Sequence, residues 1–311
     1  MDNTVVKKYF IKNAAEWVDY GHTKDGNNYP VGKHRNRIVK KIIERNKHTN
    51  SILDIGCGGG NLCVDLAKEG YKVKGVDESS EMIKIAKRSV EKLNFNYDIS
   101  FDKLSLQNIR DDKAEYDVIT SMGVIGYLDN DDILFDIASR KLYKGGKFIV
   151  SCRNRLFNLF PGSKYLKKEI DEGGVIELLN EINNLDNSNM PMGETSDFIK
   201  SIKEIEANNN LKFEKNNFIE NGPSKGLLDE SFLSEIRQHT PSSLDISADK
   251  FGFSRDAVFG VHPHLLPTTL NNKLPPGLYN QLASSLESWE ENPISLIWSS
   301  VFISVYTKNG S

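Results

Sequence analysis

Residues 51–60 have the sequence SILDIGCGGG, the most informative stretch of the chain. The apolar residues Ile52, Leu53 and Ile55 predict a short buried strand, and the glycines at positions 56, 58, 59 and 60 predict a tight turn. Residues 61–69 carry apolar side chains at four-residue spacing, which predicts a helix. Because glycine permits positive φ and close approach of the backbone, this unit can hold a nucleotide-like ligand at the start of the helix.

Strands and helices alternate through the residues that surround this unit. Helices are predicted at 32–45, 79–93 and 131–142, and further strands at 71–77, 99–106, 117–122, 147–152, 258–261 and 297–306. This alternation predicts an α/β fold, a Rossmann-like doubly wound sheet with right-handed crossovers. The strand 52–55 and these six give seven strands.

The order of the predicted helices and strands divides the chain into four predicted regions. The first is an N-terminal helical layer or lid (1–47), followed by the ligand-binding core (48–153). A helical insertion (154–245) is a candidate substrate lid, with helices expected at 176–182, 198–205 and 231–238, and a structural decoration is the alternative. The last region (246–311) adds the strands that complete the sheet, with a helix expected at 277–289.

Composition narrows the class of protein. The net charge of −3 lacks the basic surplus of most nucleic-acid-binding proteins, so we expect no nucleic-acid partner. The three cysteines have no metal-ligand spacing and indicate a reducing compartment. The N-terminal residues have no apolar run typical of a signal peptide, and no apolar run is long enough to span a bilayer. We therefore expect a cytoplasmic protein with no membrane insertion, and the oligomeric state stays open.

The spacing of the glycines separates two kinds of nucleotide site. A dinucleotide fingerprint, G-x-G-x-x-G, would need glycine at position 61, where the chain has Asn61. The chain instead has D-x-G-x-G-x-G, formed by Asp54, Gly56, Gly58 and Gly60. This pattern resembles motif I of class I S-adenosylmethionine-dependent methyltransferases.

Three later segments strengthen that resemblance, in the family's order. Residues 75–86, GVDESSEMIKIA, are similar to the family's second strand and helix. Asp117-Val118-Ile119 resembles the fourth strand, and residues 142–146, LYKGG, resemble the turn before the fifth. The resemblance covers residues 48–153 and, more loosely, the last two strands. It implies a mostly parallel sheet with an antiparallel last strand and S-adenosylmethionine as the cofactor.

The resemblance also implies which residues hold the cofactor. Asp54 would orient the turn and the cofactor's ammonium group, the turn would bring backbone N–H groups close to its methionine part, and Asp77 would accept the ribose hydroxyls. Leu106 and Gln107 fall where the family holds the adenine, although the acid that many members have there is absent. The full set of expected cofactor residues is Asp54, Gly56, Cys57, Gly58, Gly60, Asp77, Glu78, Ser79, Met82, Leu106, Gln107, Ser121, Met122 and Gly123, with Tyr9 and Trp17 from the N-terminal region.

Candidate catalytic bases lie near the C-terminus. His262 and His264, in VHPHLLP, follow a predicted strand, and their spacing of two places both on one face. One of them could accept a proton from an acceptor hydroxyl, and either could be a structural histidine. We expect no metal, because no third ligand is evident. The acidic run 129–132 is expected to cap the next helix.

These features favour transfer of a methyl group to a hydroxyl of a small molecule or of a sugar or glycan precursor, as in polysaccharide biosynthesis. The N-terminal Tyr9, Phe10, Ala14 and Trp17 resemble methyltransferases of quinone and tetrapyrrole synthesis. The segment 262–267, with the long insertion, resembles bacterial enzymes of surface-sugar modification. The alternatives are an N-methyltransferase, a quinone- or tetrapyrrole-type enzyme, or an inactive cofactor-binding partner subunit. The sequence around Ser121–Val124 lacks the N-P-P-Y type motif of enzymes that methylate DNA bases or glutamine.

Overall fold

A mixed sheet of eight strands forms the centre of the fold. The computed structural model describes residues 29–93, 96–163, 165–186, 236–274 and 277–310. The strand order is β3-β2-β1-β4-β5-β8-β7, with the short β6 paired to β5. All pairings are parallel except those of β8, which runs antiparallel to β5 and β7. The strands are β1 (Ser51–Ile55), β2 (Lys72–Asp77), β3 (Ile99–Lys103), β4 (Tyr116–Met122), β5 (Leu142–Asn154), β6 (Gln238–His239), β7 (Phe253–Pro263) and β8 (Ser299–Lys308).

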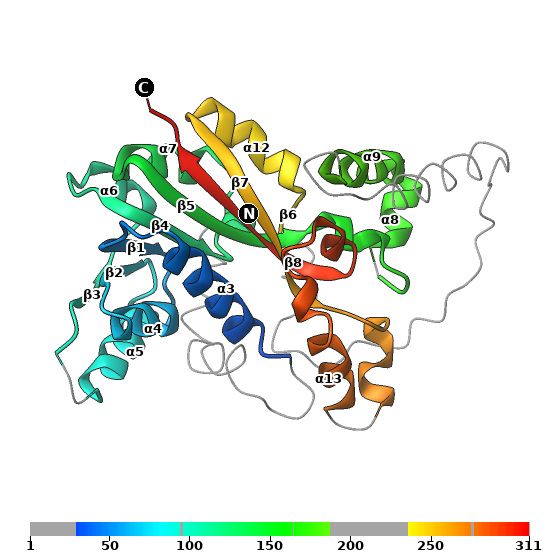
Figure 1. Ribbon diagram of the computed structural model, residues 1–311, viewed down its shortest axis with the longest axis horizontal. Helices are drawn as coiled ribbons and strands as arrows, with labels where there is room; N and C mark the ends of the chain where they lie inside the picture. Colours follow the sequence, from blue (N-terminus) through cyan, green and yellow to red (C-terminus); the bar gives the residue numbers. More distant parts are fainter. Residues whose placement is uncertain (1–28, 94–95, 164, 187–235, 275–276, 311) are drawn as a thin grey trace, which may run out of the picture.

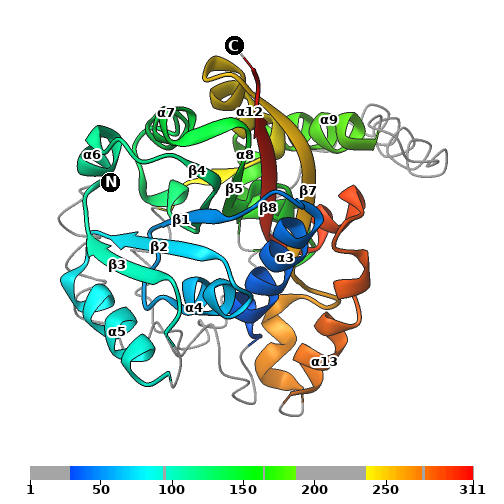
Figure 2. The ribbon, with the colours of Figure 1, turned by 60° about the vertical axis from the view of Figure 1, so that its left-hand side comes forward.

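Helices cover both faces of this sheet (Figures 1 and 2). One face packs against α3 (Val31–Arg45), α4 (Asn61–Lys68) and α5 (Ser80–Glu91). The other packs against α6 (Leu106–Asp111), α7 (Asp132–Lys141) and α12 (Pro241–Lys250). The predicted doubly wound sheet, with its antiparallel last strand, is confirmed. None of the helices among the described residues is long and apolar enough to cross a membrane.

Smaller elements follow the carboxyl ends of β4, β5 and β7. They are η1 (Ile125–Tyr127), η2 (Arg155–Leu159), α8 (Leu166–Asp171), α9 (Gly174–Asp186), η3 (Thr268–Lys273), α13 (Leu278–Ser284), η4 (Glu287–Trp289) and η5 (Pro293–Ile297).

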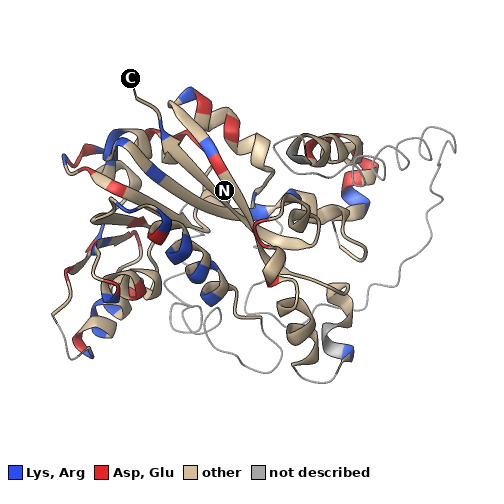
Figure 3. Ribbon diagram, viewed as in Figure 1, with Lys and Arg blue, Asp and Glu red and all other residues tan. Residues whose placement is uncertain are grey.

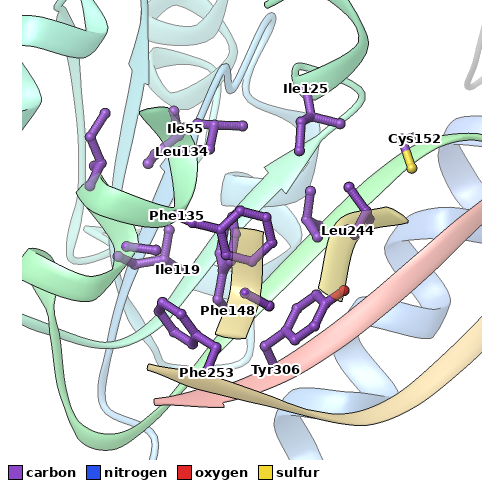
Figure 4. Packing of buried hydrophobic residues seen from close by; sticks show 14 of the residues in the cluster. Ile55, Ile119, Ile125, Leu134, Phe135, Phe148, Cys152, Leu244, Phe253 and Tyr306 are labelled. Atoms are coloured by element: carbon purple, nitrogen blue, oxygen red, sulfur yellow. The ribbon is translucent and has the colours of Figure 1, made fainter. Parts of the chain in front are cut away.

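Aromatic side chains fill the core under α7 and α12 (Figure 4). The ring of Phe135 lies edge-on to Phe148 at 5.2 Å and to Tyr306 at 5.4 Å between centroids. Phe253 completes the group at 5.9 Å from Phe135. Edge-to-face pairs of this kind contribute about 0.5–1.5 kcal/mol each beyond the area they bury. This group ties α7 to the strands on both sides of β8.

Two predicted elements differ from the structure at their ends. The strand predicted over 99–106 stops at Lys103, and α6 begins at Leu106. The cause is a helix cap, because the hydroxyl of Ser105 accepts the N–H of Asn108. The helix predicted over 277–289 is shorter, since α13 covers Leu278–Ser284 and a separate turn, η4, follows it.

The predicted insertion is described only in part. The helix expected at 176–182 is confirmed within α9, whereas the one expected at 198–205 lies outside the described residues. Of the one expected at 231–238, only residues 236–238 are described, and Gln238 belongs to β6 rather than to a helix. Because β6 joins the sheet and α12 runs across position 245, the sheet-completing part of the chain begins before the expected boundary.

Candidate functional site

The glycine turn lies at the carboxyl end of β1, where the strand order reverses. β1 pairs with β2 on one side and with β4 on the other. The crossovers from β1 and from β4 therefore leave in opposite directions, which opens a crevice between the two strand ends. Such a switch point is where open α/β sheets bind their ligands.

The three glycines of the motif have different roles in this turn. All three have positive φ, 74° at Gly56, 52° at Gly58 and 80° at Gly60. A Cβ at Gly56 would lie 2.2 Å from Val124, and one at Gly60 would lie 2.7 Å from Phe101. At Gly58 the only atom of the described residues within 4 Å of the added Cβ would be the sulfur of Met82, at 4.0 Å. Gly56 and Gly60 are therefore needed for packing, whereas a side chain at Gly58 would fill open space above the turn.

Four backbone donors of the turn, those of Gly56, Cys57, Gly58 and Gly60, are engaged within the chain. The N–H groups of Gly56 and Cys57 both donate to the carbonyl of Val76, at 2.8 and 3.0 Å. The N–H of Gly58 donates to Asp77 Oδ2 at 3.0 Å, and that of Gly60 donates to the carbonyl of Cys57. This differs from the expectation that these N–H groups face a ligand. What the turn offers is close approach over Gly58, since these four N–H groups already have partners in the chain.

Asp77 ends β2 beside the turn and is held by two N–H groups. Its Oδ1 accepts the N–H of Ser79 at 2.8 Å, opposite the Gly58 N–H on Oδ2. Burial raises the pKa of Asp77, and these two donors oppose the rise. Each carboxylate oxygen keeps a second lone pair, so Asp77 can also accept two hydroxyls of a ligand. Glu78 is half-buried next to it, and the Ser79 hydroxyl caps α5 by accepting the N–H of Met82.

Asp54 is a buried carboxylate inside β1, only 2% exposed. Its Oδ1 accepts the hydroxyl of Thr120 at 2.7 Å, and its Oδ2 accepts the thiol of Cys63 at 3.3 Å. Burial raises the pKa of Asp54 to about 6, although both hydrogen bonds and Arg35 oppose the rise. A charge buried this way is costly unless a cation faces it.

Arg35 of α3 is the cation on this side, and the sequence analysis missed it. Its Nη1 lies 3.1 Å from where a Cβ on Gly123 would be, at the end of β4. Burial lowers the pKa of Arg35, and the nearby Asp54 opposes that change. The Nε–H is buried and has no hydrogen-bond partner within the described part of the chain. A half-buried arginine whose buried Nε–H is unused is a group that would bind an anion such as a carboxylate.

Ion pairs hold α3 against the segment that precedes β8. Lys and Arg residues recur along α3 (Figure 3). Arg37 pairs with Glu287 at 3.0 Å and with Glu290 at 2.7 Å, and Arg45 pairs with Glu291 at 2.9 Å. Each exposed pair contributes little alone, but together they fix the helix that carries Arg35.

The remaining predicted cofactor residues fall at different distances from this centre. Met122 and Gly123 end β4 next to Arg35, whereas the side chain of Ser121 lies fully buried in the strand just before them. Leu106 opens α6 and packs against the core, and Gln107 is exposed on that helix. Tyr9 and Trp17 lie outside the described residues.

Asp131, within the acidic run 129–132, has another role than the expected capping, although Asn130 does accept an N–H at the start of α7. The side chain of Asp131 accepts hydrogen bonds from Arg237 at 2.7 Å and from His239 at 3.1 Å instead of capping α7. The side-chain oxygen of Asn130 accepts the N–H of Asp132. The run therefore ties β6 to α7, because Arg237 directly precedes β6 and His239 is one of the two residues by which β6 pairs with β5.

His262 and His264 lie together at the carboxyl end of β7. β7 ends at Pro263, and His262 has φ of 56°, so the strand period no longer applies. Their rings are nevertheless 4.3 Å apart. Across β5 and β8, this end of β7 lies three strand spacings from β4, about 14 Å. Both histidines are thus at the same edge of the sheet as the glycine turn.

A row of five rings runs along this edge. It consists of Tyr29, His262, His264, Phe157 and Phe160. Successive centroids are 4.7, 4.3, 4.8 and 5.2 Å apart. Tyr29 precedes α3, and the two phenylalanines come from η2 and the residue after it. Both phenylalanines are partly exposed, whereas His264 is only 4% exposed.

Comparison with known proteins places the chain among methyltransferases. Residues 31–187, just over half of the chain, match the family described as a methyltransferase domain. The ubiquinone biosynthesis O-methyltransferase of Coxiella burnetii is 31% identical over 140 residues, which cover 44% of this chain and 58% of that protein. The protein of the same name from Pelagibacter ubique is 29% identical over 189 residues, covering 55% and 76%. The chain thus spans less than two thirds of the Coxiella relative.

Solved structures agree on the fold. Magnesium protoporphyrin IX methyltransferase from Synechocystis PCC 6803, with bound S-adenosylhomocysteine, has a TM-score of 0.55 at 13% identity and covers 99% of this chain and 100% of its own. The (4+2)-cyclase SpnF has a TM-score of 0.54 at 12% identity, covering 98% and 96%. One fold therefore accompanies proteins named for different reactions, and the fold alone does not fix the activity.

Proposed function

Because the chain belongs to the class I S-adenosylmethionine-dependent methyltransferases, we propose that it transfers the cofactor's methyl group to a hydroxyl oxygen of a small molecule. The observation that carries this proposal is the arrangement around Gly58. The carboxylate of Asp77 borders the open space above the turn. Arg35, whose Nε–H is unused, lies on the side of the site next to Gly123. A nucleoside that carries an amino acid needs all three: the space, the carboxylate and the cation.

We assign the residues to the parts of the cofactor by their chemistry. Asp77 would accept the ribose hydroxyls, because its oxygens keep lone pairs beyond the two N–H bonds. Arg35 would bind the methionine carboxylate, and Asp54 would face the ammonium group. Gly58 would let the backbone approach the cofactor closely. Residues that would line the rest of the site are Gly56, Cys57, Gly60, Glu78, Ser79, Met82, Leu106, Gln107, Ser121, Met122 and Gly123, with Tyr9 and Trp17.

When bound, S-adenosylmethionine supplies a methyl group on a positively charged sulfur. In the transfer, the acceptor oxygen would form a bond to the methyl carbon, the electron pair of the broken C–S bond would pass to sulfur, and the acceptor would lose its proton. The chain has to align the acceptor, exclude water and receive that proton. His262 and His264 are the bases that we assign to the last task, since both lie at the same edge as the turn.

The relatives' names favour a small-molecule acceptor. They belong to ubiquinone biosynthesis O-methyltransferases, which supports oxygen rather than nitrogen as the receiving atom. The expected sugar or glycan acceptor and a role in polysaccharide biosynthesis draw no support from these names. Sugars therefore enter the experiments below as competing acceptors.

Calorimetric titration with S-adenosylmethionine and S-adenosylhomocysteine tests the cofactor site. We expect micromolar binding by the unaltered protein. Arg35→Leu should weaken binding about 10- to 100-fold, because a hydrogen bond between charged groups is worth about 1.5–3 kcal/mol. Asp77→Asn should weaken it by a similar factor. Arg88→Leu, which alters an exposed arginine of α5, is the matched control and should bind normally.

Failure of the unaltered protein to bind either compound would contradict the proposal. Full binding by Arg35→Leu would remove Arg35 from the site while leaving the rest in place. Binding without transfer to any hydroxyl or amine would instead favour an inactive partner subunit, and transfer to amines alone would favour an N-methyltransferase.

A further inference from the structure

We infer that the acceptor is a planar aromatic alcohol that stacks against Phe157 and Phe160, with its hydroxyl donated to Nε2 of His264. This inference rests on the proposed methyl transfer and names its acceptor class and its base. It is carried by three observations: the hydrogen bonds of His264, the ring row, and the different surroundings of His262.

The hydrogen bonds of His264 determine which ring nitrogen carries the proton. Nδ1 lies 2.7 Å from the hydroxyl oxygen of Tyr279. That hydroxyl donates its single proton to the carbonyl of Leu266 at 3.0 Å. Tyr279 therefore accepts from His264, and Nδ1 carries the hydrogen. Nε2 is left with a lone pair that can accept a proton.

This lone pair has no partner within the described part of the chain. The Nε2 atom of His264 is buried and unpaired, and the residue as a whole is 4% exposed. A buried polar atom normally has a partner, and one that lacks it is costly. The backbone of His264 is fixed, because its N–H donates to the carbonyl of Trp298 at 2.8 Å. A ligand hydroxyl would supply the missing donor.

The neighbouring phenylalanines indicate the shape of that ligand. Phe157 and Phe160 are stacked at 5.2 Å with an interplanar angle of 16°, and Phe157 lies 4.8 Å from His264. Both rings are partly exposed at the carboxyl end of β5. A flat aromatic ring can extend this stack and reach the histidine, whereas a sugar ring lacks the π-system of an aromatic pair.

His262 is a poorer base than His264. Of the two, only His264 has a buried ring nitrogen without a partner among the described residues. Tyr29 stacks on the ring of His262 at 4.7 Å and 14°. Its Nδ1 is paired with the hydroxyl of Ser300 at 2.9 Å. His262 thus serves to position Tyr29 and His264.

The chemistry of the base agrees with an aromatic alcohol. Burial lowers the pKa of His264 to about 4, so the ring is neutral and able to accept a proton at pH 7. A base this weak needs an acidic donor, and a phenolic hydroxyl ionises near pH 10, far more readily than an aliphatic alcohol. As the acceptor oxygen forms its bond to the methyl carbon, Nε2 takes the hydroxyl proton and later releases it to water.

Nitrogen-15 NMR of the histidine rings tests the base without any turnover. At pH 7 we expect Nδ1 of His264 to be protonated and Nε2 unprotonated. Tyr279→Phe should release this tautomer preference, since it removes the acceptor. A protonated Nε2 in the unaltered protein would overturn the inference.

Binding of 2-naphthol and of its saturated analogue, decahydro-2-naphthol, tests the acceptor shape in the presence of S-adenosylhomocysteine. We expect the flat compound to bind about 3- to 10-fold more tightly, the range given by one aromatic stack. Phe157→Leu should remove most of this preference. Equal binding of the two compounds, or binding of neither, would overturn the inference.

Turnover compares 2-naphthol with methyl glucoside. His264→Ala should lower kcat for 2-naphthol by about 100-fold or more with S-adenosylmethionine binding unchanged. His264→Gln serves as a second variant should the alanine protein not fold. His48→Ala changes an exposed histidine and is the matched control. This inference would be overturned, with methyl transfer left intact, by full turnover of a folded His264 variant or by transfer to methyl glucoside in preference to 2-naphthol. Absence of cofactor binding by the unaltered protein would instead contradict the proposed function itself.

Discussion

Replacing Asp54 by asparagine should stabilise the folded chain at neutral pH and at the same time weaken cofactor binding. The carboxylate is buried within β1, and burial raises its pKa from 3.8 to about 6 in the folded chain. One pKa unit corresponds to about 1.36 kcal/mol, so keeping Asp54 ionised costs the folded state about 3 kcal/mol. Asparagine has nearly the same shape and carries no charge.

The hydrogen bonds at this position survive the change. The amide oxygen can accept the hydroxyl of Thr120, as Asp54 Oδ1 does at 2.7 Å. The amide N–H would face the sulfur of Cys63, a weak acceptor that now donates to Oδ2 at 3.3 Å. The gain at neutral pH should therefore approach the full 3 kcal/mol (about two pKa units).

The gain should depend on pH in a defined direction. Between pH 4 and 6 the folded chain keeps the Asp54 proton while the unfolded chain loses it, so the stability of the unaltered protein falls as the pH rises. Below pH 4 both states are protonated and the two proteins should be equally stable. The groups that face Asp54 are Thr120, Cys63, Arg35 and, at longer range, Asp77.

Guanidinium unfolding at pH 3.5, 5, 6, 7 and 8 would measure the difference in stability between the Asp54→Asn protein and the unaltered protein. Calorimetry would measure cofactor binding by both proteins. Asp98→Asn alters an exposed aspartate next to β3 and is the control. A stability difference that does not change with pH, or an Asp54→Asn protein less stable than the unaltered chain at pH 8, would refute the reasoning. Unchanged cofactor affinity would remove Asp54 from the binding site.

Two further predictions concern packing. Gly58→Ala and Gly60→Ala should each lower the free energy of unfolding by about 1–2 kcal/mol, because alanine disfavours positive φ. Gly60→Ala should lower it by at least about 1 kcal/mol more, because its Cβ would lie 2.7 Å from Phe101. Chemical unfolding and cofactor titration check this pair, and stronger binding by Gly58→Ala than by Gly60→Ala would contradict the assigned roles. Phe135→Ala should destabilise by about 3–5 kcal/mol, since Phe135 is fully buried, while Tyr143→Ala, at a residue 47% exposed, should stay within about 0.5 kcal/mol of the unaltered protein. Comparable losses in these two variants would refute the described core.

The sheet could be predicted from sequence because its signals are local. Apolar runs such as 52–55, glycines at strand ends and helical periods each depend on a few neighbouring residues. The prediction was wrong where a local competitor ended an element. Ser105 caps a helix inside the region expected to be the third strand, because a serine hydroxyl can replace the strand's own hydrogen bonds.

The candidate site could be predicted only where one segment contains it. Asp54, the glycines and Asp77 lie in β1, its turn and β2, which adjoin in sequence and in space. Arg35 was missed although a signal exists, because it shares the apolar stripe of α3 with Val39 and Ile42, four and seven residues later. Phe157 and Tyr279 had no such signal, since only the fold brings η2 and α13 to His264.

The start of α3 connects the two halves of the site through neighbouring residues. Successive residues of a helix point about 100° apart, so His34 and Arg35 face different surroundings. Arg35 reaches the end of β4, where the cofactor's methionine part would lie, while His34 meets the hydroxyl of Tyr29 at 2.7 Å beside the ring row. His34 is in turn held by Glu290 at 3.0 Å, which also pairs with Arg37 on the next turn. A displacement of α3 would therefore move Arg35, the proposed partner of the cofactor's carboxylate, together with His34, which contacts the first ring of the row.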